Sequence, residues 1–293
     1  MKKIVSFIAV ASLAAGMLSG CGGTASGGGQ SPPEFNTARE ITVVSREDGS
    51  GTRGAFVELV GIEERDADGN RRDRTTREAL IANRTDVMLT SVTNDPYAIG
   101  YVSLGSLNDS VKGLSINGVA PTSENIISGA YVISRPFNIA TKGAPEGLAL
   151  DFISFILSAE GQAVVSRNYI AVDGAAAPFV GELPTGRLVI AGSSSVSPVI
   201  ERLAEAYMEI NEGADLQIQT SDSTTGINSL IEGIADIGMA SRDLRESELA
   251  QVTGLVIAVD GIAVIVNNEN PIGNLEAETV RQIFVGEITT WEL

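Results

Sequence analysis

Three loops of this sequence have the residue types to bind an anion, and each follows an apolar run and precedes a helical pattern. They are "SREDGSGTRGAF" at residues 45–56, "GSSSVSP" at 192–198 and "SDSTTG" at 221–226. Serine and threonine hydroxyls are neutral donors, and glycine lets the backbone approach a ligand closely. The start of a helix adds unpaired N–H groups and the positive end of its dipole. Together the loops predict a site for a tetrahedral oxyanion.

One loop also offers a fixed cation, because the guanidinium of Arg46 can bind an oxyanion through two parallel hydrogen bonds. For any single loop the alternative is plain helix capping, since serine and threonine are common cap residues. The occurrence of three such loops, one of them with two arginines, favours a site. No Gly-Lys-Ser/Thr follows any of them, so we do not predict a nucleotide site.

The composition limits the chemistry further. The 293 residues include no histidine and one cysteine, and the formal net charge is -17. The lack of histidine excludes histidine-dependent triads, imidazole bases and the commonest zinc sites, and we expect no metal and no cofactor. The acidity argues against nucleic acid as a partner, whereas a small anion responds to the local potential of its site.

The first residues are typical of a bacterial lipoprotein. A basic "MKK" precedes an apolar run at 4–18 that is too short to span a bilayer, and "LSGC" resembles the lipobox, in which the signal is cut before the cysteine. We therefore expect a signal peptide at 1–20, lipidation of Cys21 and a flexible tether over 21–39. The alternative is an ordinary secretory signal with an incidental cysteine.

The elements that must position these loops alternate between strand and helix patterns, which predicts an α/β fold. The clearest helix is 197–210, with apolar residues at helical spacing, Ser197 as a cap and Pro198 in its first turn. Residues 174–186 are predicted to be a connector. The other expected helices are 52–60, 147–166, 225–233 and 276–284, and the expected strands are 41–44, 86–92, 98–104, 187–192, 215–220 and 261–267.

The loops and their flanking segments resemble a known family. "GRLVIAGSSSVSPVIERLAEAY", "DSTTGINSLIEGIADIGMASRDL", "NLEAETVRQIFVGEITTW" and "ITVVSREDGSGTRGAF" are similar to the substrate-binding lipoproteins of bacterial ABC-type phosphate importers. The resemblance implies a two-lobed type II periplasmic-binding-protein fold with the ligand cleft between the lobes. It also implies a lipid-anchored protein on the extracytoplasmic face of the cell membrane, which captures inorganic phosphate and delivers it to the membrane permease. We expect a monomer.

The order of the segments differs from the family's usual order, because "REDGSGTR" comes first and "GEITTWEL" ends the chain. This indicates a circular permutation, which requires the original termini to have been close and predicts that Leu293 ends near Ile41. The alternative is a truncated tandem of two half-domains. The predicted lobes are 40–130 plus 268–293, with the Arg-Ser-Gly-Thr loop, and 131–267, with the Gly-Ser-Ser-Ser loop.

The resemblance carries the family's anion-binding roles onto matching positions. Asp48 is expected to orient Arg46, with turn chemistry as the alternative. Arg242 is expected to brace the hinge or to donate to the anion. The expected phosphate-binding residues are Ser194, Ser195, Ser223, Arg46, Ser50, Gly51, Thr52 and Ser241.

Ser241 is also a departure from the family, since some members place an aspartate there to accept the proton of hydrogen phosphate. A serine can accept as well as donate, but it discriminates less well; Asp222 or Asp260 could replace the acceptor. Another oxyanion (sulfate, molybdate or tungstate) or a surface sensing or adhesion role therefore stays open. An enzyme with a serine nucleophile is disfavoured, because no histidine is present to activate it.

Overall fold

The computed structural model describes residues 35–66 and 71–293. The predicted signal peptide and Cys21 lie outside the described residues, so the lipidation site stays a prediction.

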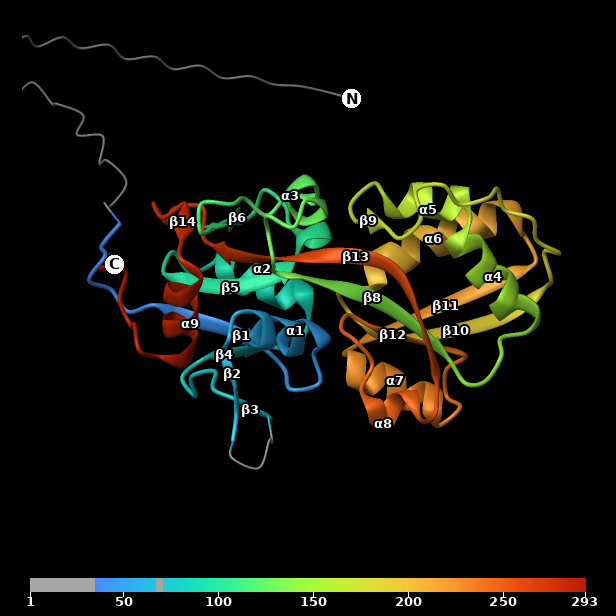
Figure 1. The fold of residues 1–293 in the computed structure, drawn as a ribbon, viewed down its shortest axis with the longest axis horizontal. Helices are drawn as coiled ribbons and strands as arrows, with labels where there is room; N and C mark the ends of the chain where they lie inside the picture. The colour runs from blue at the N-terminus through green and yellow to red at the C-terminus, as the bar shows by residue number, and fades with distance from the viewer. Residues whose placement is uncertain (1–34, 67–70) are drawn as a thin grey trace, which may run out of the picture. The chain divides into compact units, whose positions relative to one another are not determined.

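A long mixed sheet organises the described chain, in the order β11-β10-β12-β8-β13-β5-β1-β4 (Figure 1). β6 and β9 pair with β13, and two small sheets, β14-β7 and β2-β3, lie apart from this path. The bounds are β1 Thr42–Arg46, β2 Glu63–Arg65, β3 Arg71–Asp73, β4 Leu80–Ala82, β5 Ala98–Ser103, β6 Lys112–Gly113, β7 Ser115–Ile116, β8 Ser134–Thr141, β9 Ile170–Ala171, β10 Gly186–Ser193, β11 Ala214–Ser221, β12 Ile237–Ala240, β13 Thr253–Val266 and β14 Asn274–Leu275.

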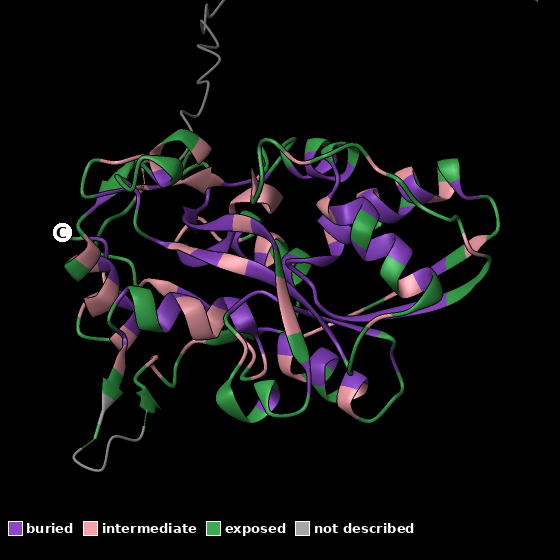
Figure 2. Cartoon of the chain, turned by 45° about the vertical axis from the view of Figure 1, so that its right-hand side comes forward, coloured by how far each residue is buried: buried purple, intermediate pink, exposed green. Residues whose placement is uncertain are grey.

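The sheet serves two lobes, and β13 takes part in both. Its residues 253–261 pair with β8, and 262–266 pair with β5. We call the part built on β1, β4 and β5 the first lobe, and the part built on β10, β11 and β12 the second lobe. Each has its own apolar core, around Phe56, Tyr101 and Trp291 in the first and around Phe137, Ile190 and Tyr207 in the second. Figure 2 shows that the central strands are largely buried, although β13 begins with exposed and half-buried residues.

Helices cover the sheet of each lobe. In the first lobe they are α1 (Gly51–Leu59), α2 (Thr85–Thr93), α3 (Ser123–Ile127) and α9 (Ala277–Val285), with the 3-10 helix η1 at Leu104–Ser106. In the second they are α4 (Gly147–Leu157), α5 (Ala159–Val165), α6 (Ser197–Ile210), α7 (Ser223–Ile231) and α8 (Glu246–Leu249). The predicted helix at 197–210 is confirmed, but its cap is wrong: Val196 occupies that position and Ser197 begins the helix.

Two other predictions of local structure are wrong. Residues 86–92, expected as a strand, belong to α2, because Met88 and Val92 lie one helical turn apart and are both buried against the sheet. The single helix expected at 147–166 is broken at Ser158 into α4 and α5, which are bent by 67°. Ser158 is extended, and its hydroxyl caps α5 by accepting from Gly161 N.

No single helix among the described residues is long and apolar enough to cross a membrane, although α4 and α5 pass that test when taken together. In this structure the inward side chains of both helices, including Phe152, Phe155 and Val165, belong to the core of the second lobe.

The described chain returns to its starting point, as predicted. Ile41 N donates to Thr289 O at 2.8 Å, Glu40 forms a bridge with Thr290, and the Trp291 indole donates to Tyr97 O at 3.1 Å.

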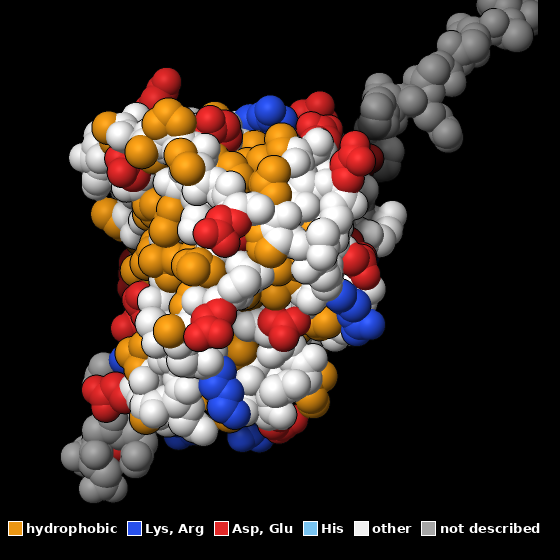
Figure 3. All heavy atoms as spheres, turned by 90° about the vertical axis from the view of Figure 1, so that its right-hand side faces the viewer, with side chains coloured by type: hydrophobic (Ala, Val, Ile, Leu, Met, Phe, Trp, Pro, Cys, Tyr) orange, Lys and Arg blue, Asp and Glu red, His pale blue; other side chains and the backbone are white. Residues whose placement is uncertain are grey.

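The connector after β9 runs over the second lobe, where Figure 3 shows hydrophobic side chains between isolated acids. In the connector, Val180 is 91% exposed.

These contacts predict that the chain order can be changed without loss of the fold. The test protein joins Leu293 to Ile41 by a short linker and is opened after Gly174, which is exposed with nothing near its Cβ position. It should melt in a single cooperative transition, with a midpoint within a few degrees of that of wild type. A control opened within β8, which pairs with both β12 and β13, should not fold. Failure of the first protein to fold would contradict the prediction.

Candidate functional site

Hydroxyls and one arginine from the two lobes meet in a buried cluster. Thr52 Oγ1 lies 2.8 Å from Ser195 Oγ, and Arg46 Nη2 donates to Ser194 Oγ at 3.1 Å. Thr85 Oγ1 lies 3.2 Å from Ser194 Oγ and 3.4 Å from Ser195 Oγ. All five side chains are buried. We call Arg46, Thr52, Thr85, Ser194 and Ser195 the hydroxyl cluster.

Helix starts supply these side chains. Thr52 is the second residue of α1, Thr85 is the first of α2, and Ser194 and Ser195 lie in the turn that leads from β10 into α6. Because helix N-termini expose N–H groups and positive dipole ends, the cluster lies where an anion is favoured.

A second row of serines lies beside the cluster. Ser193 Oγ donates to Ser241 Oγ at 2.9 Å, Ser241 N donates to Ser223 Oγ at 3.1 Å, and the hydroxyls of Ser223 and Ser241 are 3.4 Å apart. Gly51 lies against this row: a Cβ there would be 2.4 Å from Ser223 Oγ and 2.8 Å from Ser241 Oγ. Only glycine therefore permits this approach of the two lobes.

The loop of residues 45–52 makes further contacts with the second lobe. Gly49 O accepts from Thr224 N at 3.2 Å and from Thr224 Oγ1 at 3.1 Å. Ser50 is buried and caps α1, accepting from Arg53 N at 3.3 Å. The carboxylate of Asp222 lies against Gly49 and caps α7. The predicted binding residues of both lobes thus lie on facing loops.

The acid that holds Arg46 is Glu47, which corrects the expectation for Asp48. Arg46 Nε and Nη2 each donate to a Glu47 carboxylate oxygen at 2.8 Å. Asp48 instead pairs with Arg53 at 2.7 Å, and its side chain is 96% exposed. Arg53 in turn donates to Arg46 O at 2.8 Å. Although burial works in the opposite direction, Asp73 and Asp48 raise the pKa of Arg53 above its ordinary value.

Arg242 braces the second lobe. It donates to both carboxylate oxygens of Glu248, at 2.8 and 2.7 Å, and to Thr224 Oγ1 at 3.3 Å. These contacts lie within the second lobe, and the expected roles of Arg242 at the hinge and at the anion both stay predictions. Although burial works the other way, Arg242 holds the pKa of Glu248 below its ordinary value.

Asp260, one of the two acids considered as a proton acceptor, pairs with Arg135 at 3.2 Å and accepts from Gly105 N at 3.3 Å. Burial raises its pKa to about 6, although the charge of Arg135 opposes this.

Tyr101, whose pKa burial also raises, contacts Ser45 Oγ and accepts from Arg46 N at 3.1 Å. The loop that carries Arg46 is thus attached to β5.

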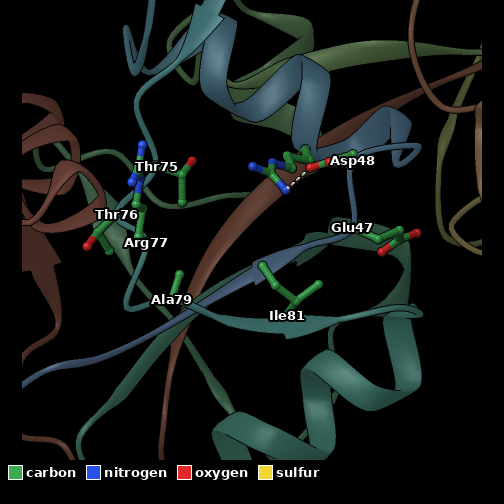
Figure 4. Close-up of a pocket in the computed structure, with 8 residues that line it drawn as sticks. Glu47, Asp48, Thr75, Thr76, Arg77, Ala79 and Ile81 are labelled. Carbon is green, nitrogen blue, oxygen red and sulfur yellow. Dashed lines mark hydrogen bonds and ion pairs between the residues drawn. The ribbon is translucent and has the colours of Figure 1, made fainter.

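A surface pocket of about 440 Å³ adjoins the same loop (Figure 4). Glu47, Asp48 and Arg53 line it together with Thr75, Thr76, Arg77, Ala79 and Ile81. We assign the site to the hydroxyl cluster instead, because there helix starts of both lobes converge. No group of three or more His, Cys, Asp or Glu side chains that could hold a metal occurs in residues 35–66 and 71–293.

Two residues of the site were missed by the sequence analysis. Thr85 was not predicted, because residues 86–92 were expected to form a strand and no helix start was assigned before them. Ser193 lies inside the recognised serine run, but its contact with Ser241 depends on the parallel pairing of β10 and β12, which sequence spacing does not show.

Comparison with known proteins places the chain in a family. A model of the PBP superfamily domain matches residues 31–160 and 180–293. The chain is 50% identical to the phosphate-binding protein PstS 2 of Streptococcus agalactiae, over 99% of this chain and 97% of the other. It belongs to the PstS family of the PBP superfamily.

A solved PstS-family structure has the same fold. It is the crystal structure of a phosphate ABC transporter, phosphate-binding protein from Streptococcus pneumoniae, with a TM-score of 0.69 and 42% identity, covering 86% of this chain and 98% of that one. The Bacillus subtilis phosphate-binding protein PstS is 34% identical, but only over 114 residues, which are 38% of each chain. The expected two-lobed fold is thus confirmed.

The Arg242–Glu248 pair leads to a prediction about stability. Glu248→Gln should lower the free energy of unfolding by about 3 kcal/mol at pH 7, because it leaves a buried arginine without its counter-charge. A carboxylate with a lowered pKa stabilises the fold above its ordinary pKa of 4.5, and this contribution is lost as the pH falls through the lower folded value. The difference between variant and wild type should therefore shrink below that range in urea titrations.

Glu246→Gln is the matched control, since Glu246 is exposed in the same short helix. Equal losses in the two variants, or a loss at Glu248 that does not vary with pH, would contradict this account.

Proposed function

We propose that this protein captures inorganic phosphate outside the cytoplasm and delivers it to an ABC importer. The observation that carries the proposal is the convergence of Thr52, Thr85 and Ser194–Ser195 at three helix starts beside Arg46. Such a cluster offers a dehydrated oxyanion many neutral donors and one fork-shaped cation. Membership of the PstS family supports the ligand, since the relatives are named phosphate-binding proteins.

In this proposal the anion lies between the facing hydroxyls, replacing the direct Thr52–Ser195 and Arg46–Ser194 contacts by contacts with its own oxygens. Ser223 and Ser241 bind from the second lobe, and Gly51 brings backbone N–H groups close. The lobes then turn about β8 and β13, the strands that connect them. A role as an enzyme is disfavoured, because the sequence has no histidine to activate a serine.

The cellular setting forms part of the same proposal. Cleavage after residue 20 and lipidation of Cys21 would anchor a monomer to the outer face of the cell membrane through the tether of 21–39. The lobes are proposed as 40–130 plus 268–293, and 131–267. The crossing of β13 into the first lobe at residue 262 refines this division.

Circular permutation of the family's usual order is supported by two observations. Ile41 and Thr289 are hydrogen-bonded, as a direct connection between these segments in the usual order requires. The PstS 2 relative aligns over nearly the whole chain, whereas the Bacillus subtilis PstS aligns over 38% of each chain. A partial match of this kind is what an alignment in chain order gives when the halves are exchanged.

One observation favours a second candidate, another oxyanion such as sulfate. Ser241 Oγ accepts a hydrogen bond from Ser193 Oγ, so the Ser241 hydroxyl has its own O–H available to donate. A donor at this position suits an oxyanion without a proton as well as it suits phosphate. The selectivity for phosphate therefore depends on an acceptor elsewhere in the site.

Calorimetry tests the proposal. The protein should bind phosphate, and Thr52→Val or Thr85→Val should weaken binding about tenfold to a hundredfold, since a hydrogen bond to a charged group contributes about 1.5–3 kcal/mol. Arg46→Ala should weaken it at least as much. Thr90→Val, at an exposed position of α2, is the matched control. Unchanged binding by the site variants would contradict the site, and stronger binding of sulfate than of phosphate would favour the second candidate.

Lobe closure can be tested at Gly51. Gly51→Ala should reduce phosphate affinity at least tenfold, because the new methyl group would occupy the space of the Ser223 and Ser241 hydroxyls. The thermal midpoint of the ligand-free protein should change little, since the lobes can stay apart. Gly54→Ala in the same helix is the control, because its nearest neighbour would be 3.9 Å away. Equal affinities for the two variants would show that closure does not need this contact.

A further inference from the structure

Arg135 is a buried arginine that none of the expected roles uses. It lies on β8 directly opposite Asp260 on β13, where the two strands connect the lobes (Figure 1). The side chains are 2% and 1% exposed. Only Nη2 of Arg135 reaches the carboxylate, at 3.2 Å, while Nε and Nη1 are buried without a hydrogen-bond partner among the described residues. Buried donors without partners are costly and call for an explanation.

The pair is connected to the Arg46 loop. Asp260 Oδ1 accepts from Gly105 N at 3.3 Å, just after β5 ends. Earlier in β5, the Tyr101 hydroxyl accepts from Arg46 N at 3.1 Å. Besides burial, which lowers the pKa of Arg135 to about 10, the positive charge of Arg46 also lowers it. Val264, which pairs with Tyr101, lies four residues after Asp260 on β13 and so points to the same face of the sheet. The Arg135–Asp260 pair and the Arg46 loop are therefore attached to one face of the sheet, and an anion bound between them would lie near both positive charges.

The other cations near the site are better compensated. Arg46 forms two hydrogen bonds with Glu47, and Arg53 pairs with both Asp73 and Asp48. Arg135 has one bond to one carboxylate, and that carboxylate is shared with Gly105 N. Arg46, Arg53 and Arg242 each make two hydrogen bonds to carboxylates, whereas Arg135 makes one. The Arg135 guanidinium also lies 5.3 Å from the centroid of the Phe137 ring, an uncharged partner.

We propose that Arg135 is a second positive charge of the anion site, which strengthens anion binding through space, and that Asp260 limits this effect. The inference rests on the proposed function, since it needs an anion between the lobes. It makes Arg135 a residue that determines affinity without touching the ligand. The competing explanation is that Arg135 and Asp260 only fasten the connecting strands together.

The two explanations predict different changes in phosphate affinity for the variants Arg135→Gln and Asp260→Asn. Arg135→Gln removes the charge and should weaken phosphate binding about tenfold in calorimetry. Asp260→Asn removes the opposing charge and should tighten binding several-fold. Both should lower the thermal midpoint of the ligand-free protein, because each leaves a buried group without its partner. A fastening role predicts that both variants lose stability and affinity together.

Arg135→Lys is the conservative variant, which keeps the charge and loses the planar fork, and it should bind within about threefold of wild type while melting lower. Arg187→Gln, which removes an exposed charge at the far end of β10 from the cluster, is the control and should leave binding unchanged. If Arg135→Gln does not fold, Asp260→Asn and Arg135→Lys still decide, because weaker binding by both overturns the proposal.

Measurements on wild type separate this inference from the function on which it rests. If wild type binds phosphate and the variants follow only their stability, the inference fails and the function stands. If wild type binds neither phosphate nor sulfate, the proposed function fails, and the inference fails with it.

Discussion

The structure depends on the direct meeting of short hydroxyl side chains across the two lobes. Thr52 and Ser195 are 2.8 Å apart, and Gly51 approaches Ser223 and Ser241 so closely that a methyl group does not fit. Side chains this short contact one another only when the two backbones lie close together. Helix starts suit such an approach, because their first N–H groups have no partner within the helix. The loops, the helix starts and the glycine at position 51 together make this approach possible.

A strongly acidic protein can hold an anion in this way because its charges are compensated locally. Arg46 is paired with Glu47 and Arg53 with Asp73, so the cluster acts mainly through neutral donors and dipoles. Carboxylates on the outer surface are screened by solvent and salt, and they contribute little to the potential inside a buried cluster. The net charge of -17 and an anion site are therefore compatible.

The sequence was sufficient to predict the α/β fold, the family and most of the facing loops, since those depend on local patterns and recognisable motifs. It failed where tertiary context decides. Residues 86–92 form an apolar run that suits a strand, but burial of Met88 and Val92 on one side makes them a helix, and Thr85 was missed with it. The partners of Arg46 and Asp48 were also wrong, because adjacent acids in one loop differ only in the direction of their side chains.

The strands that connect the lobes explain how a changed chain order would leave the site intact. β8 and β13 pair with each other and reach both lobes, and neither includes the chain ends near Thr289 and Ile41 or the connector over 174–186. Cutting and rejoining the chain at those places alters no strand that sets the relation between the lobes. It also alters no helix start in the cluster. The geometry of an anion site built from facing loops is therefore insensitive to where the chain begins.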